Sequence, residues 1–279
     1  MNLPQFYVDD VIMRALREDI NYLDVSSDYL LPDGQRDTAY FVSKADGVLC
    51  GLSVALRTFE LLDASFEANV FKHDGDRLKK GDVIAEFSGE TALLLKGERT
   101  ALNLMQHMSG VATATARAVE LVRGTNAQIT DTRKTLPGLR ALEKYAVVCG
   151  GGKNHRFNLS DGAMLKDNHI DAGGGIQKTV DALRGKLGHM VKIEVETRNL
   201  EEVRQALEAR ADIIMLDNMA YDDMRRAVEL IAGRAKVEAS GGITLENLRE
   251  VALTGVDIIS LGALTHSVHA FDISMRMKK

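Results

Sequence analysis

The sequence is poor in cysteine, in long apolar runs and in excess positive charge, and each absence excludes a class of protein. Two cysteines, Cys50 and Cys149, form no disulfide framework and lack metal-motif spacing, so we interpret both as small buried apolar side chains. No segment approaches the roughly 20 apolar residues of a membrane span, and the N-terminus carries acids where a signal peptide has cations. These features predict a cytoplasmic protein that does not cross a membrane.

Acidic residues outnumber basic ones, 40 against 35, which gives a net charge of -5. This balance disfavours a nucleic-acid-binding surface, and a basic stretch inside an acidic chain indicates a local site for a small anion. With 279 residues, of which 45% are hydrophobic, the chain can bury a large core. We therefore expect one large barrel or two domains.

One basic stretch, residues 130–169, concentrates cations among glycines and few acids. We single out Arg133, Lys134, His155, Arg156 and Lys166 among its cations. Most charge runs are solvated faces, but here short polar clusters alternate with apolar or Gly-rich segments, which is typical of loops on a rigid scaffold. Because planar guanidinium groups suit carboxylates and phosphates, we interpret the stretch as an anion site.

The first half of the chain predicts a small mixed α/β domain. Val8, Ile12, Leu16 and Ile20 recur every four residues and indicate a short amphipathic helix. Residues 40–89 consist of short apolar runs punctuated by glycines, a pattern of strands and turns. From Thr91 to about Val122 the pattern becomes that of one long helix, and we place the domain junction within it.

The second half repeats a strand followed by a helix, in KIEVET–NLEEVRQAL, IIMLDNM–YDDMRRAVELI and KVEASGGI–TLENLREVAL, and ends in IISLGALTH. Such repeats predict a parallel sheet with right-handed crossovers, either a barrel or an open doubly wound sheet. We favour the barrel because polar residues recur where strands end, and barrel active sites collect on that rim. These residues are Asp131 to Lys134, Glu196, Asp217, Ser240 and Gly262 to His266.

Two features of this rim are candidates for ligand binding. Ser240-Gly241-Gly242 ends a strand before a helix that Thr244 can cap, so it is either an ordinary glycine turn or a phosphate site, which Gly262 and His266 would complete. Glu196 and Asp217 end largely apolar strands, so each needs a partner or a ligand to offset its desolvation. A salt bridge to a neighbouring Lys or Arg is the structural alternative.

The chain resembles the quinolinate phosphoribosyltransferase family, the decarboxylating enzymes of NAD synthesis. The resemblance rests on DTRKTLPGLRALEKYAVVCGGGKNHR followed by LSDGAMLKDNH, and on LREDI, ERTALNLMQHMSG, KIEVET, IIMLDNM, VEASGGI and SLGALTHS in the family's order. It implies an N-terminal α/β sandwich domain, residues 1–110, to which residues 270–279 can return. It also implies that residues 111–269 form an incomplete α/β barrel with fewer than eight strands.

The resemblance further implies that quinolinate is bound by Arg133, His155, Arg156 and Lys166, with Arg99 supplied by the partner subunit of a homodimer or larger homo-oligomer. The matching residues for the phosphoribosyl group of phosphoribosyl pyrophosphate (PRPP) are Lys134, Glu196, Asp217, Asn218, Ser240, Gly241, Gly242, Gly262 and His266. Of these, Lys134, Glu196 and Asp217 have the catalytic roles. Mg²⁺ would be held mainly by the substrate's phosphates and water. The remaining alternatives are a phosphoribosyltransferase for another pyridine and a non-catalytic phosphate-binding barrel.

Overall fold

A computed structural model describes residues 3–278, which form two compact units. The first unit comprises residues 3–116, 135–151 and 264–278, and the second comprises residues 117–134 and 152–263. These units differ from the contiguous ranges 1–110 and 111–269, because residues 135–151 pack with the first unit. The contiguous domain boundaries stay a prediction.

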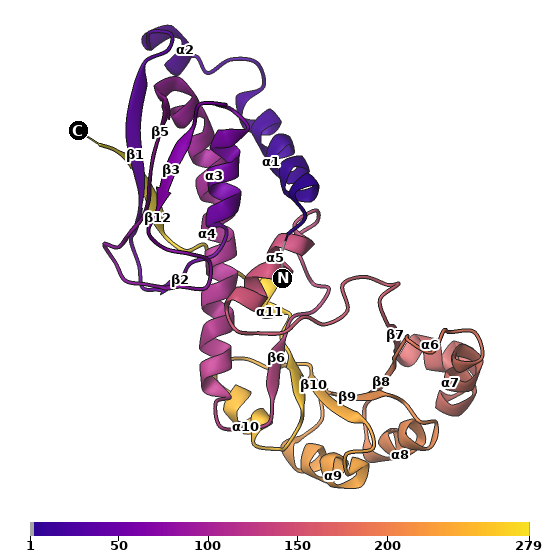
Figure 1. Cartoon of the computed structure of the whole chain (residues 1–279). Helices are drawn as coiled ribbons and strands as arrows, with labels where there is room; N and C mark the ends of the chain where they lie inside the picture. Colours follow the sequence, from indigo (N-terminus) through magenta and orange to yellow (C-terminus); the bar gives the residue numbers. More distant parts are fainter. Residues whose placement is uncertain (1–2, 279) are drawn as a thin grey trace. The chain divides into compact units, whose positions relative to one another are not determined.

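The first unit contains a four-stranded antiparallel sheet in the order β12-β1-β5-β3 (Figure 1). The C-terminal strand β12 pairs with β1, so that Phe41 lies opposite Met275. The elements of this unit are α1 (Gln5–Ile20), α2 (Ser27–Leu30), β1 (Arg36–Ser43), β2 (Gly47–Val48), α3 (Leu52–Glu60), β3 (Glu67–Val70), β4 (Arg77–Leu78), β5 (Val83–Glu90), most of α4 (Thr91–Leu121), α5 (Arg140–Cys149), the end of α11 (Ala263–His266) and β12 (Ile273–Met277).

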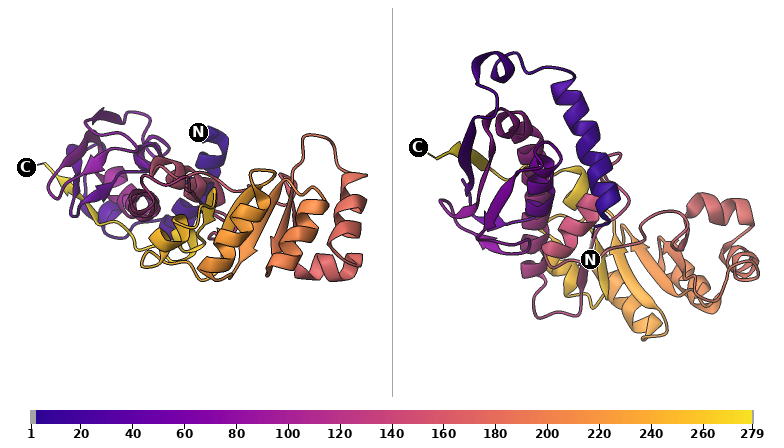
Figure 2. Two further views of the ribbon diagram at one scale, coloured as in Figure 1. Left: turned by 90° about the horizontal axis from the view of Figure 1, so that it is seen from below. Right: turned by 45° about the horizontal axis from the view of Figure 1, so that its top comes forward.

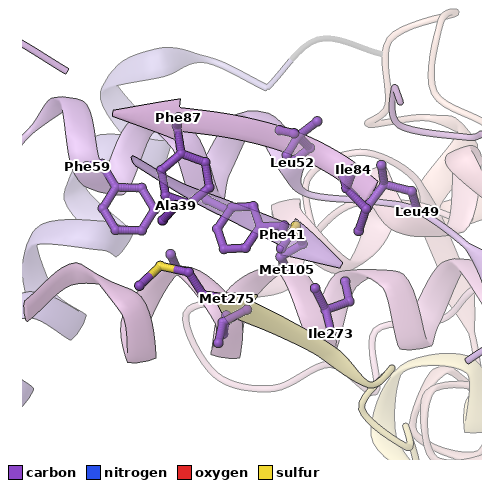
Figure 3. Close-up of a cluster of buried hydrophobic side chains, with 14 of the residues drawn as sticks. Ala39, Phe41, Leu49, Leu52, Phe59, Ile84, Phe87, Met105, Ile273 and Met275 are labelled. Carbon is purple, nitrogen blue, oxygen red and sulfur yellow. The ribbon is translucent and has the colours of Figure 1, made fainter. Parts of the chain in front are cut away.

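An aromatic cluster fills the space between this sheet and its helices (Figure 3). Phe87 on β5 lies 4.7 Å from Phe41 on β1 and 5.1 Å from Phe59 on α3, measured between ring centroids. All three rings are almost fully buried. Offset or tilted ring pairs at such distances add to the free energy of apolar burial, so the cluster fixes α3 against the sheet.

A second core cluster joins α1, α4 and α5. Val8, Ile12 and Leu16 are buried along one face of α1, and Ile20 is half-buried, which confirms the predicted amphipathic helix. Cys50 is buried in this cluster, whereas Cys149 packs against it half-buried, and both thiols are free. The predicted long helix is confirmed as α4.

The second unit contains a six-stranded parallel sheet in the order β6-β11-β10-β9-β8-β7. Helices lie along the outer side of the strands (Figure 2). With β6 and β7 at its edges, the sheet is the predicted α/β barrel with fewer than eight strands. Its elements are β6 (Gln128–Thr130), β7 (Ala163–Leu165), α6 (Asp167–Gly173), α7 (Ile176–Arg184), β8 (Ile193–Thr197), α8 (Leu200–Glu208), β9 (Ile213–Asp217), α9 (Tyr221–Ile231), β10 (Lys236–Ser240), α10 (Leu248–Ala252) and β11 (Ile258–Ser260).

Strand register places the acids of this sheet on one face. Glu196 on β8 and Glu238 on β10 both pair with Met215 on β9. Two residues further along, Asp217 on β9 pairs with Ser240 on β10. Residues in register on parallel strands point to the same side, and every second residue returns to that side. Glu196, Glu238 and Asp217 therefore point to the same face of the sheet, and the residues between them along each strand point to the opposite face.

Among the described residues, no helix combines the length and the apolarity needed to cross a membrane.

Candidate active site

Two of the predicted site residues in the second unit form an ion pair at the carboxyl end of the sheet. Lys166 follows β7, and its Nζ lies 3.3 Å from Oε2 of Glu196 on β8. Half of the Lys166 side chain is exposed, so the pair itself contributes little to folding. The salt bridge considered as the structural alternative for Glu196 is present, and it joins two residues that the resemblance assigns to the site.

The loop after β10 is built around two glycines with left-handed backbone, at φ +88° for Gly241 and +59° for Gly242. The backbone N–H of Asn218 donates to the Ser240 carbonyl at 3.0 Å, and Asn218 Nδ2 donates to Oδ2 of Asp217 at 3.1 Å. The loop after β10 thus packs directly against the end of β9. This arrangement brings together the predicted phosphoribosyl residues Asp217, Asn218, Ser240, Gly241 and Gly242.

The expectation that Thr244 caps a helix after this turn is wrong. The next helix, α10, begins only at Leu248 and has five residues. Asn247 instead closes the turn, since its Oδ1 accepts the Thr244 N–H at 2.8 Å and its Nδ2 donates to the Gly242 carbonyl at 3.1 Å. The side-chain amide of Asn247 competes with helix formation at this point.

We expect Gly241→Ala to disturb the Asp217–Asn218 corner. A Cβ at this position would lie 2.5 Å from the Asn218 side-chain amide, on a backbone that L side chains rarely adopt. The amide must move away from Asp217, so the Km for PRPP, the substrate that the resemblance implies, should rise by about 10-fold or more. Steady-state kinetics would test this, with Gly233→Ala as the control. Gly233 also has a left-handed backbone, at φ +75°, but a Cβ added there would meet no atom within 4 Å. Equal effects of both variants would contradict the steric account.

The second unit also has a partly open pocket of about 310 Å³. His155 and Arg156 line it, together with Thr130, Asn154, Asp161, Gly162, Ala163, Met190, Lys192, Glu194, Ile213, Glu238 and Ile258. Because Lys192, Ile213 and Ile258 lie at the starts of strands β8, β9 and β11, the pocket extends into the sheet's inner face rather than only over its carboxyl ends.

His155 lies between two buried carboxylates. Its Nε2 is 3.1 Å from Glu194 Oε2 and 3.5 Å from Glu238 Oε1. Burial alone would lower the pKa of His155, but the two carboxylates outweigh it and raise that pKa to about 10. On the other side of the ring, the backbone N–H of Arg156 donates to Nδ1 at 2.8 Å.

Arg156 is half-buried and held by weak acceptors. Its Nη1 donates to the Gly162 carbonyl at 2.9 Å, and its Nη2 lies 3.5 Å from the Met164 sulfur. Burial and, secondly, the charge of Arg133 lower the pKa of Arg156. Two guanidinium groups close enough to repel each other are stabilised when an anion binds between them.

Three acids support these residues: Asp131, which was predicted on the rim without a role of its own, and Glu194 and Glu238, which were not predicted. Asp131, fully buried after β6, accepts the His155 N–H at 2.9 Å and the Asn154 side-chain amide at 2.6 Å. Glu194 and Glu238 contact the ring of His155. A signal was present, because Glu194 precedes Glu196 by two residues and Glu238 precedes Ser240 by two, which places each pair on one face of its strand.

The other predicted residues lie in loops or in the first unit. Arg133 and Lys134 are exposed in the loop after β6, and Gly262 follows β11. In the first unit, Arg99 is exposed on α4, and His266 is exposed at the end of α11 with its Nδ1 2.6 Å from Ser267 Oγ.

Comparison with known proteins finds matches over most of the chain. Residues 24–109 match the model described as the N-terminal domain of quinolinate phosphoribosyl transferase, and residues 111–276 match its C-terminal domain. A Bacillus subtilis protein named probable nicotinate-nucleotide pyrophosphorylase (carboxylating) is 50% identical, over 92% of this chain and 89% of its own. A Mycobacterium leprae protein named nicotinate-nucleotide pyrophosphorylase (carboxylating) is 43% identical over 95% of each chain.

A solved structure gives the same result. The crystal structure of NadC from Streptococcus pyogenes superimposes with a TM-score of 0.96 at 42% identity, and the match covers 100% of both chains. The chain thus contains both family domains in order, and the solved structure matches it over its full length. The chain belongs to the quinolinate phosphoribosyltransferase family.

Proposed function

We propose that the protein transfers the phosphoribosyl group of PRPP to quinolinate in the cytoplasm, with loss of carbon dioxide, to give nicotinate mononucleotide for NAD synthesis. The observation that carries this proposal is the pocket in which His155 and Arg156 face the same space, in a chain of this family. Quinolinate carries two adjacent carboxylates, and the convergence of cationic side chains suits such a dianion. The relatives' name, pyrophosphorylase (carboxylating), describes the same reaction in reverse.

The chemistry takes place within the two substrates. The pyridine nitrogen of quinolinate attacks the anomeric carbon of PRPP, and the C–O bond to pyrophosphate breaks with its electron pair. The positively charged ring then accepts the electron pair of the C2–carboxylate bond as carbon dioxide leaves, and C2 takes a proton from solvent. The protein's contribution is to position both substrates and to stabilise charge.

Each predicted residue has a place in this scheme. Arg133, His155, Arg156 and Lys166 hold the two carboxylates of quinolinate, and Lys134 serves quinolinate and the phosphoribosyl group together. Glu196 and Asp217 face the ribose hydroxyls and the positive charge that develops at the anomeric carbon. The backbone at Ser240, Gly241 and Gly242 receives the phosphate, with Asn218 and Gly262 around it, and the resemblance assigns His266 to the same group.

Mg²⁺ enters the proposal with PRPP. Among the described residues, two groups of three potential metal ligands lie close together, Cys50–Asp74–Cys149 and His155–Glu194–Glu238, and neither includes Glu196 or Asp217. A Mg²⁺ ion near the ribose would take most of its ligands from pyrophosphate and water, because Mg²⁺ dehydrates reluctantly. The carboxylates of Glu196 and Asp217 would then orient its waters.

The proposal includes a homodimer in which Arg99 serves the partner's site. Support comes from the exposure of Arg99 on α4 and of the apolar Leu95 one turn before it. Arg99→Ala and Lys166→Ala homodimers should both be nearly inactive. After mixing and subunit exchange, half of the dimers would be hybrids with one intact site, so about a quarter of wild-type activity should return. No recovery despite proven exchange would contradict the shared site.

The function is tested by supplying PRPP and Mg²⁺ with quinolinate in one reaction and nicotinate in another, and by measuring pyrophosphate. Release with quinolinate alone supports the proposal. Release with nicotinate alone indicates a transferase for a different pyridine. Release with neither, from a folded protein, contradicts transferase activity and leaves a phosphate-binding barrel.

A further inference from the structure

The chain has two cysteines, and the first unit brings them together. Cys50 lies between β2 and α3, and Cys149 is the last residue of α5. These positions are far apart in the sequence, yet their Sγ atoms lie within 4.8 Å of each other. An S–S bond is roughly 2.05 Å long, so the sulfurs must approach by less than about 3 Å to form one. Rotation about χ1 moves each sulfur, so this approach does not require a large shift of the backbone.

The two thiols have different surroundings. Cys50 is fully buried, and Ser109 on α4 holds its backbone: the Cys50 N–H donates to Ser109 Oγ at 2.9 Å, and that hydroxyl donates to the Cys50 carbonyl at 3.0 Å. Cys149 is half-buried and is followed by three glycines, residues 150–152. A small oxidant can therefore reach Cys149 first, and the end of α5 can adjust more easily than the segment at Cys50.

Asp74 lies beside both thiols, but its carboxylate is already bound within the protein. Its Oδ1 accepts the Leu52 N–H, and its Oδ2 accepts the Gly51 N–H and the Tyr145 hydroxyl, each at 3.0 Å. One carboxylate thus holds both the start of α3 and the middle of α5, the two helices next to the cysteines. A metal ion would have to compete with these hydrogen bonds, and two thiols alone do not fill the four-coordinate site that Zn²⁺ takes. The two thiols are therefore better placed to react with each other than to hold a metal.

We propose that Cys50 and Cys149 are a site of reversible oxidation, at which a low-molecular-weight disulfide such as oxidised glutathione converts the two thiols into an intramolecular disulfide. This inference does not depend on the proposed function. It assigns a modification site to the first unit, away from the residues proposed to bind the substrates.

The oxidation consists of two exchange steps. Cys149 gives up its proton, and its sulfur attacks one sulfur of the small disulfide, which forms a mixed disulfide and releases one small thiol. Cys50 then gives up its proton, and its sulfur attacks Cys149 Sγ, which forms the protein disulfide and releases the second small thiol. The protein loses two protons and two electrons, and the small disulfide gains both. An excess of a dithiol reductant reverses the exchange.

The bond would connect the β2–α3 junction to the end of α5. Without it, α5 is held in the first unit by apolar contacts with α1 and α4 and by the Tyr145–Asp74 hydrogen bond. Closing a loop of about 100 residues restricts the unfolded chain more than the folded one, so the disulfide should stabilise the folded protein. Because disulfides in a reducing compartment are transient, the stability of the first unit would follow the redox state of its surroundings.

The direct test is a mass measurement on the folded wild-type protein after treatment with oxidised glutathione. Remaining thiols are blocked with N-ethylmaleimide in denaturant. We expect a chain that has lost two hydrogen atoms and carries neither glutathione nor maleimide, with the peptide of Cys50 linked to that of Cys149. Dithiothreitol should restore two reactive thiols. Two reactive thiols after the treatment, or a bond between two chains, would overturn the inference.

Single variants separate the two steps. In Cys50→Ala, the mixed disulfide at Cys149 has no second thiol to resolve it, so one glutathione per chain should remain attached. In Cys149→Ala, the buried Cys50 should stay unmodified until the protein is unfolded. A stable mixed disulfide at Cys149 in the wild-type protein would show that Cys50 does not reach it, and would overturn the inference.

Thermal unfolding shows whether the bond fits the folded protein. The oxidised wild type should have a Tm higher than the reduced form by on the order of 5 °C. Cys149→Ala, the matched control, should have the same Tm with and without the oxidant. A lower Tm of the oxidised wild type would show that the bond distorts the first unit, and would contradict a native thiol pair.

Discussion

Arg156→Ala is expected to raise the Km for quinolinate on the order of 100-fold or more. The guanidinium is half-buried, and within residues 3–278 its bonds go to the Gly162 carbonyl and the Met164 sulfur, so most of its donor capacity remains for a carboxylate. Without Arg156, the guanidinium of Arg133 in the loop after β6 remains as a neighbouring positive charge. The Km for PRPP should change much less.

Two matched variants make the Arg156 result specific. Arg156→Lys keeps a point charge and loses the planar fork, so its Km should lie between those of wild type and Arg156→Ala. Arg225→Ala removes an exposed arginine on α9 that pairs with Asp222, and its kinetics should be those of wild type. A normal Km for quinolinate in folded Arg156→Ala would remove Arg156 from the site.

Glu196→Gln lowers kcat by about 100- to 1,000-fold, in the range seen when one preorganised electrostatic contact to a transition state is removed. The isosteric amide keeps the shape of the side chain but lacks the charge that opposes the developing cation at the anomeric carbon. Because Lys166 Nζ lies 3.3 Å from Glu196, the change also frees Lys166 from its partner. At saturating concentrations of both substrates, weaker binding through Lys166 no longer limits the rate, so the remaining loss in kcat reports the missing charge of Glu196.

The double variant Glu196→Gln/Lys166→Ala tests which consequence dominates. If Glu196 stabilises the transition state, its loss lowers kcat whether or not Lys166 is present, and Lys166→Ala acts mainly on the Km for quinolinate. A Glu196→Gln variant with wild-type kcat would show that the carboxylate serves only the salt bridge.

The sequence identified the rim of the sheet because strand ends are local features. Apolar runs that end in Glu196, Asp217 and Ser240 are visible in the chain, and their meeting at one edge follows from parallel pairing. The length of α4 was likewise predictable from its helical pattern. Such features depend on neighbouring residues, so no knowledge of distant contacts was needed.

The interior of the site depends on contacts between distant segments. Glu194 and Glu238 are far apart in the chain, and their meeting at the ring of His155 follows only from the order of the strands. The packing of α5 with the first unit also depends on apolar contacts with α1 and α4. The turn after Gly242 was wrongly assigned to helix capping because Asn247, rather than Thr244, bonds across it.

The most direct test of the proposed function follows the carboxylate that leaves. Quinolinate is labelled with ¹³C in the carboxylate at C2 or in the carboxylate at C3 and is supplied with PRPP and Mg²⁺, and labelled carbon dioxide, pyrophosphate and nicotinate mononucleotide are counted. We expect the three products in equal amounts, with all the label released from C2 and none from C3. Pyrophosphate released without carbon dioxide, or label released from C3, would contradict the decarboxylating transfer.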